Sequence, residues 1–178
     1  MSAVVAFTVT NEPLSDELEA LFREHSRLVY RTAYSVTGSP EDAEDVVQGL
    51  FLHLVRRGVP PGLRESPKGY LYRAAVNLSL NALKARQRRE AAQSQWGPAP
   101  AGPMPPLDRS TGLQDRLVHA IAQLNPRAVE MLILRYEHDY SATEIGRLLG
   151  TSRAVVAVTL FRARARLKKL LRNSGEPS

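Results

Sequence analysis

The chain contains no cysteine and no long run of apolar residues. Its 178 residues therefore hold no disulfide, no thiolate metal site and no cysteine nucleophile. No apolar run approaches the roughly 18 residues that a membrane-spanning helix needs, and residues 1–13 lack the basic start and apolar core of a signal peptide. We therefore expect a soluble, cytoplasmic protein without membrane contacts.

Motifs for catalysis and metal binding are also missing. The four histidines are scattered without metal-ligand spacing, and there is no glycine-rich phosphate loop, no serine elbow and no carboxylate pair placed opposite a histidine. These absences argue against an enzyme and predict neither a cofactor nor a metal site.

Charge is distributed unevenly along a chain whose formal net charge is +6. Residues 1–63 carry 5 basic and 9 acidic side chains, residues 64–90 carry 7 and 2, and residues 127–178 carry 10 and 5. Basic segments commonly meet phosphate, so two of them suggest two contacts with nucleic acid. Solvated helix ends are the simpler alternative.

The chain divides into two helical domains. Residues 91–112 hold five prolines and three glycines without any helical or strand period, which predicts a linker. Convincing strand-like alternation is absent on both sides of it, so the expected fold class is all-α, with two small helical domains joined by a Pro/Gly/Ala-rich linker. The expected boundaries are an N-terminal tail at 1–13, domains at 14–90 and 113–172, and a C-terminal tail at 173–178. In the first domain, apolar spacing predicts helices at about 16–36, 40–57 and 67–89, with a loop before the third.

The second domain carries the signature of a helix-turn-helix. A helix that starts at Pro126 has Tyr136 on its inward face. Ser141 and Glu144 then form a capping box at the start of a short helix. Gly150 ends that helix, and a longer, arginine-rich helix follows. Short helix, glycine turn and basic second helix together favour DNA binding over an ordinary helical hairpin.

The segment "SPEDAEDVVQGLFLHL" (residues 39–54) gathers four carboxylates at the start of a helix. Ser39 is a good N-cap, Pro40 suits the first helical position, and acids there complement the helix dipole. Capping does not account for the exposed row that continues along the helix, which contains Glu41, Asp45, Gln48 and Leu52, with Asp42, Gly49 and His53 beside it. This row is either a docking face for a basic partner or a solvated face.

The third helix combines aromatic and basic residues. Its start, "YLYRAAVN", contains Tyr70 and Tyr72, and its end, "NALKARQRRE", is strongly basic. Each tyrosine ring either stacks on unpaired bases or is buried in the core. The basic end either contacts phosphate or is solvated.

These segments, in this order, resemble bacterial RNA polymerase sigma factors of the extracytoplasmic-function type. "SPEDAEDVVQGLFLHL" is similar to the family's helix that docks on the β′ clamp helices of RNA polymerase. "YLYRAAVNLSLNALKARQRR" is similar to the segment that melts and reads the minus-ten promoter element. "LNPRAVEMLILRYEHDYSATEIGRLLGTSRAVVAVTLFRARARLKKLL" is similar to the region that reads the minus-thirty-five element. The resemblance covers residues 16–89 and 113–172.

The resemblance implies a transcription initiation factor without catalysis of its own. Its partners would be core RNA polymerase, at the β′ clamp helices and the β flap, and promoter DNA; anti-sigma factors are also common partners in the family. Polymerase docking would involve Glu41, Asp42, Asp45, Gln48, Gly49 and Leu52. The minus-ten element would be contacted by Tyr70, Arg73, Asn77, Asn81, Lys84, Arg86 and Arg88. The minus-thirty-five element would be contacted by Thr151, Ser152, Arg153, Ala154, Ala157, Phe161, Arg162 and Arg164.

Two departures from the family pattern matter. Gly49 stands where the family often has an acidic residue, so docking is expected to differ there. The segment "RAVVAVTLF" lacks the basic residues common in the middle of the reading helix, and apolar side chains contact thymine methyl groups but cannot read guanine. We therefore expect upstream discrimination to rest on Arg153, apolar contact and DNA shape.

Two other functions remain open at the level of sequence. A stand-alone helix-turn-helix transcriptional regulator would bind DNA alone and would not need the acidic row. A helical adaptor or inhibitor that binds polymerase without reading DNA would not need the two basic helices.

Overall fold

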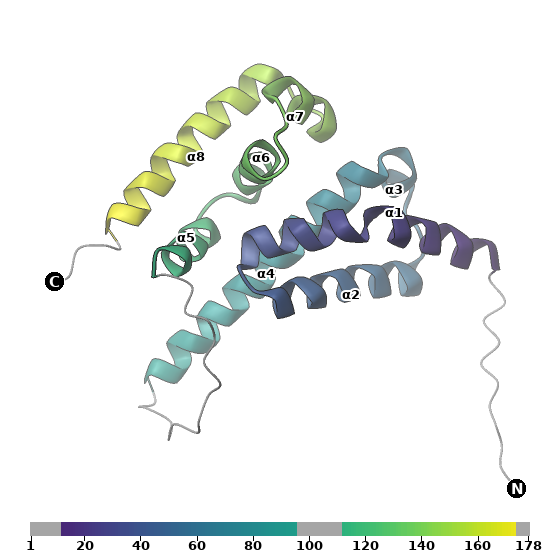
Figure 1. Ribbon diagram of the computed structural model, residues 1–178, viewed down its shortest axis with the longest axis horizontal. Coiled ribbons are helices and arrows are strands. Elements are labelled where there is room, and N and C mark those ends of the chain that lie inside the picture. The colour runs from purple at the N-terminus through teal and green to yellow at the C-terminus, as the bar shows by residue number, and fades with distance from the viewer. Residues whose placement is uncertain (1–11, 96–111, 174–178) are drawn as a thin grey trace, which may run out of the picture.

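The computed structural model describes residues 12–95 and 112–173, and every regular element in those ranges is a helix (Figure 1). The N-terminal unit contains α1 (Glu12–Thr37), α2 (Pro40–Arg57), α3 (Pro61–Glu65) and α4 (Pro67–Gln95). The C-terminal unit contains α5 (Gly112–Ala122), α6 (Pro126–Tyr136), α7 (Ala142–Leu149) and α8 (Arg153–Asn173). The prediction of an all-α, two-domain fold is confirmed.

In the N-terminal unit, α1 and α2 form a hairpin that packs against α4. Gly38 has a φ of 66°, a left-handed conformation that lets α1 end and α2 begin two residues later. The apolar faces of these helices bury a core to which the short α3 contributes Leu63. The core is made of Leu18, Val29, Ala33, Ala43, Val46, Leu50, Phe51, Leu54, Leu63, Leu71 and Ala75.

The C-terminal unit is organised around the turn between α7 and α8. The capping box forms as predicted: the Ser141 hydroxyl accepts from the Glu144 N–H, and the Glu144 carboxylate accepts from the Ser141 N–H. Gly150 ends α7 with a φ of 64°. The inward faces of both helices then meet α6, where Ile145 and Val156 are fully buried.

The two units share one hydrophobic core. It runs from Val36 on α1 and four residues of α4 (Tyr72, Val76, Leu80 and Leu83) into all four helices of the C-terminal unit. Because α4 is buried on one side by α1 and α2 and on the other by the C-terminal unit, it lacks a single apolar face. Its C-terminal end projects beyond the other helices (Figure 1).

Several predicted boundaries differ from the structure. The helix α1 begins at Glu12, inside the segment predicted as a tail, because Pro13 is tolerated in a first helical turn. The helix α4 continues to Gln95, five residues into the predicted linker, because Glu, Ala and Gln favour helix and the first following proline is Pro98. At the other end of that linker, Gly112 already belongs to α5. The helix α3 lies in a segment predicted as a loop, and prolines open its first turn.

His138, which follows α6, should make the free energy of unfolding depend on pH. Burial and the neighbouring Arg31 and Lys68 lower the pKa of its imidazole, outweighing Glu137, which raises it. The unfolded chain therefore binds a proton more readily than the folded chain, so stability is lost as the pH falls below the usual histidine value of 6.5. When the pH is lowered from 7.5 to 5.5, urea unfolding should show that the free energy of unfolding falls more for the wild type than for His138→Gln. Equal losses would contradict this role for His138.

Candidate protein and nucleic-acid interfaces

The outer face of α2 displays the acidic row. The exposed residues are Glu41, Glu44, Asp45, Gln48, Gly49 and Leu52, which we call the acidic face. The Ser39 side chain caps the helix by accepting a hydrogen bond from the Asp42 N–H at 3.2 Å, as the sequence predicted. Leu52 is 51% exposed although it is apolar. The acidic face is thus accessible along three turns of α2, with an apolar residue at its end.

Two of the predicted interface residues bind each other. The Arg86 guanidinium donates to the Asp42 carboxylate at 2.8 Å and to the Thr37 carbonyl oxygen at 3.4 Å. Both side chains of this ion pair are about two-thirds buried. The pair joins α4 to α2, a structural role that neither the acidic row nor the basic helix end predicted.

A hollow lies between α2 and α4 beside the acidic face. Its lining includes Asp45 and Gly49 from α2 and Leu78 and Arg89 from α4. A Cβ added to Gly49 would meet no atom within 4 Å, so this glycine leaves open space at the surface. Leu78 is 39% exposed, and the predicted interface did not include it. The hollow could accept a side chain of a docked partner.

The outer side of α4 carries a polar and basic row. Asn77, Asn81, Lys84 and Arg88 are all exposed and follow one another at steps of four, three and four residues, so they share one face of the helix. Tyr70 is half-buried about two helical turns before Asn77. The structure therefore brings four of the seven predicted minus-ten residues into a single row, which we call the α4 row.

The remaining aromatic and basic residues of α4 divide between surface and core. Tyr72 is completely buried, and its hydroxyl donates to the Glu130 carbonyl oxygen. Arg73 is half-buried, and its Nε donates to the Gly69 carbonyl oxygen at 3.2 Å. Of the two tyrosines, only Tyr70 retains a surface that can contact a base.

The helix α8, which the sequence resemblance predicts to contact DNA, presents an exposed face that is largely apolar. The exposed predicted residues are Arg153, Ala154, Ala157, Phe161, Arg162 and Arg164. Phe161 is 68% exposed, and the neighbouring Val155 and Val158, which were not predicted, are about half exposed. Ser152 is the N-cap of α8, since its hydroxyl accepts from the Val155 N–H at 3.2 Å, and Thr151 is half-buried. Base contacts of this face would be mainly apolar, with Arg153 at the leading end.

A second hollow, between α6, α7 and α8, brings Arg135, which the sequence analysis did not single out, together with two predicted basic residues. It is lined by Arg135, Tyr136 and Thr143 together with the predicted Arg153 and Arg164. The Arg164 guanidinium donates to the Tyr136 hydroxyl at 3.2 Å. Cations beside the N-terminus of a helix suit a phosphate group.

The inward position predicted for Tyr136 is wrong. Tyr136 is 58% exposed: it lies in the last turn of α6 and lines the open hollow with residues of α7 and α8 instead of being buried beneath them. The sequence does hold a signal for this hollow: Arg135 and Tyr136 stand just before the capping box that starts α7, so a basic residue is expected near the N-terminus of that helix.

The described residues contain no group of three or more His, Asp or Glu side chains arranged to hold a metal ion. Among the helices in the described ranges, none is both long enough and apolar enough to cross a membrane.

Comparisons with known proteins identify both units. A family model described as sigma-70 region 2 matches residues 21–89, and one described as sigma-70 region 4 matches residues 114–167. The RNA polymerase sigma factor CarQ of Myxococcus xanthus is 30% identical over 158 residues, which cover 88% of this chain and 90% of CarQ. The chain belongs to the extracytoplasmic-function sigma factors. The α4 row thus lies in region 2 of this sigma factor, and most of α8 lies in region 4.

Other relatives of this sigma factor are longer. The ECF RNA polymerase sigma factor SigE of Mycolicibacterium smegmatis is 31% identical over 159 residues, covering 86% of this chain and 61% of SigE. SigG of Mycobacterium tuberculosis is 30% identical over 195 residues, covering 93% of this chain and 52% of SigG. The chain thus spans between about half and three-fifths of the length of these two relatives.

A solved structure is also similar. It contains the sigma factor RpoE in complex with the anti-sigma factor NepR, from Bartonella quintana. The match has a TM-score of 0.49 and 20% identity, and it covers 88% of this chain and 97% of that one.

Proposed function

We propose that this protein binds core RNA polymerase, directs it to specific promoters and helps to open them, without catalysis of its own. In this proposal the acidic face of α2 docks on polymerase, the α4 row contacts the minus-ten element, and α8 contacts the minus-thirty-five element. Membership of the sigma-factor family supports each of these assignments.

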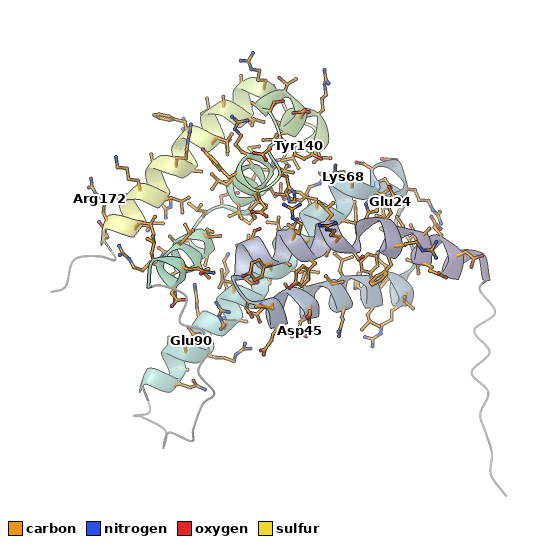
Figure 2. All side chains as sticks on the ribbon, in the orientation of Figure 1. Glu24, Asp45, Lys68, Glu90, Tyr140 and Arg172 are labelled. Atoms are coloured by element: carbon orange, nitrogen blue, oxygen red, sulfur yellow. The ribbon has the colours of Figure 1, made fainter. Side chains whose placement is uncertain are left out.

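The acidic face is the observation that carries the proposal. Carboxylates repel the phosphate backbone, so the exposed Asp45 and Glu41 do not suit contact with DNA. Figure 2 shows Asp45 on the side of the N-terminal unit that faces away from the C-terminal unit. A regulator that bound DNA alone would leave this surface without a role. A protein partner with a basic surface accounts for it.

The other two surfaces fit promoter DNA. Lys84 and Arg88 supply positive charge along the α4 row, and Asn77 and Asn81 supply side-chain amides that can pair with base edges. On the C-terminal unit, the hollow that contains Arg135, Arg153 and Arg164 would hold a backbone phosphate beside the reading helix.

Retention of core RNA polymerase tests the proposal. The double variant Asp45→Ala/Gln48→Ala should retain polymerase roughly tenfold or more weakly than the wild type, because the centre of a docking face carries most of the binding energy. Both side chains are exposed, so the free energy of unfolding should change by no more than about 0.5 kcal/mol.

The matched control is Asp16→Ala/Gln123→Ala, which removes the same two side-chain types from exposed positions on α1 and just after α5. It should bind polymerase like the wild type. If the wild-type protein itself fails to retain core polymerase, or if both double variants bind equally well, docking through the acidic face is disproved.

A further inference from the structure

Two predicted interface residues, Asp42 and Arg86, lie between the acidic face and the α4 row instead of within them. The Asp42 side chain is 27% exposed and that of Arg86 is 33% exposed, and they form an ion pair at 2.8 Å. Arg86 is two residues from both Lys84 and Arg88, so it points to another side of α4 than the row. Strong binding of either charge to a partner would require the pair to break, so the structure favours a different role for both residues.

This ion pair is the centre of a junction of three helices. Thr37 is the last residue of α1, and its carbonyl oxygen accepts from the Arg86 guanidinium at 3.4 Å. The Ser39 N–H donates to the Thr37 hydroxyl at 3.3 Å, and the Ser39 hydroxyl accepts from the Asp42 N–H at the start of α2. A cation at the end of α1 and a carboxylate at the start of α2 both complement the helix dipoles. We call Thr37, Ser39, Asp42 and Arg86 the joint.

Apolar packing contributes little to the contact between α2 and α4 beside the joint. A hollow separates the two helices there, and its lining includes the small residues Gly49, Ala82 and Ala85. Among the described side chains of α4, Leu83 is the last that is buried in a core. The helix then projects beyond the others, and Figure 2 shows Glu90 on this projecting part. The joint, one turn after Leu83, therefore sets the direction in which the end of α4 leaves the unit.

We propose that Asp42 and Arg86 are positioning residues whose ion pair fixes the angle between α2 and α4. Polymerase docked on the acidic face of α2 then carries the α4 row onto the minus-ten element in the correct orientation. Lys84 and Arg88 flank Arg86, so a change at the joint displaces these two cations first. The proposal rests on the proposed function, because the angle matters to a protein that binds polymerase and DNA at the same time. It replaces the direct contacts predicted for Asp42 with polymerase and for Arg86 with DNA.

The substitution Asp42→Asn distinguishes positioning from direct contact by the sign of its effect. Opening of the minus-ten element by the holoenzyme, measured as permanganate reactivity of unpaired thymines, should fall about three- to tenfold, a usual size for coupling between neighbouring residues. Retention of core polymerase should stay within about twofold of the wild type. If Asp42 merely held Arg86 away from phosphate, the variant would free that cation and opening would rise. If Asp42 contacted polymerase, retention would fall.

Variants at the other side of the pair complete the test. Arg86→Gln should lower opening as Asp42→Asn does, and the double variant should open promoters no less than the worse single variant, because both substitutions remove the same contact. Arg86→Lys keeps a cation facing Asp42 and should recover at least about half of the wild-type opening. Asp16→Asn and Arg27→Gln remove the same charges from exposed positions on α1 and should behave like the wild type.

A distance measurement in the free protein reports on the angle directly. Because the chain has no cysteine, nitroxide labels can be attached at His53→Cys on α2 and Gln93→Cys on α4, two exposed positions. Pulsed electron paramagnetic resonance should give a narrow distribution of distances between the labels when the joint is intact. The distribution should broaden in Asp42→Asn and in Arg86→Gln, and should stay narrow in Arg86→Lys. Circular dichroism at the assay temperature checks that each variant is folded.

Three results would overturn the positioning role. They are increased opening in Asp42→Asn, loss of polymerase retention in the same variant, and an unchanged distance distribution in both single variants, which is the result expected if the pair merely stabilises the fold. Failure of the proposed function is a separate result, in which the wild-type protein does not retain core polymerase. The distances in the free protein would still show whether the joint fixes the angle.

Discussion

Gly146→Ala should lower the free energy of unfolding by about 1–3 kcal/mol, the usual result of overpacking a closed core. A Cβ at this position would lie 2.7 Å from the carbonyl oxygen of Thr151. The neighbouring atom belongs to the backbone, and the Thr151 N–H donates to the Gly146 carbonyl oxygen at 2.8 Å. The turn that carries α8 away from α7 must therefore shift. Urea unfolding followed by circular dichroism measures the loss.

The matched substitution is Gly49→Ala, also in a helix. No atom lies within 4 Å of the added Cβ, and the residue is exposed, so alanine should only remove the conformational entropy cost of glycine. We expect the free energy of unfolding to rise by up to about 1 kcal/mol. If the two variants changed stability in the same direction, the close contact at Gly146 would not be the cause.

Gly146→Ala should also weaken binding to the upstream promoter element. The predicted DNA contacts Arg153 and Ala157 begin directly after the turn, so a shift of α8 displaces both from the major groove. Footprinting with polymerase should show upstream protection reduced and minus-ten protection largely retained. Loss of both protections together would point to global unfolding instead.

Tyr72→Ala should lower the free energy of unfolding by about 3–5 kcal/mol, the range for removing a large buried aromatic side chain. Tyr72 is completely buried in the core that both units share, and its ring meets the His138 ring edge-to-face at 6.1 Å. The cavity would therefore weaken α4 and α6 together. Calorimetry or urea unfolding measures the effect.

Tyr72→Phe separates the hydroxyl group from the ring. It keeps the packing and removes only the hydrogen bond to the Glu130 carbonyl oxygen, which should cost about 0.5–1.5 kcal/mol. Burial raises the pKa of the Tyr72 hydroxyl, so the group stays protonated and donates throughout the physiological range. An alanine variant no less stable than the phenylalanine variant would show that the ring is not part of a packed core.

Local signals in the sequence were sufficient for most helix boundaries and for the helix-turn-helix. Ser39 and Pro40 predicted the start of α2, and the Ser141 capping box predicted α7, because a cap is satisfied by residues three positions away. The acidic face followed from the same short-range pattern. The end of α4 was missed because good helix formers continued past the expected stop.

Residue pairs that are distant in sequence were beyond the reach of such signals. Asp42 and Arg86 are 44 residues apart, and both were predicted to contact partners before the structure placed them in one ion pair. The sequence left Tyr70 and Tyr72 equivalent, because a helix packed on two sides has no clear apolar stripe to assign them to core or surface.

Composition, caps and charge order thus determined that this protein is all-α, that a cluster of acids lies at the start of one helix of the first domain, and that the two most basic segments lie later in the chain. Whether the two domains touch was decided only by tertiary structure. A linker permits any separation, whereas the packing of α4 against α6 depends on side chains such as Tyr72 and Glu130, 58 residues apart. Burial and long-range hydrogen bonds exist only once the chain has folded, so they cannot be inferred from patterns of neighbouring residues.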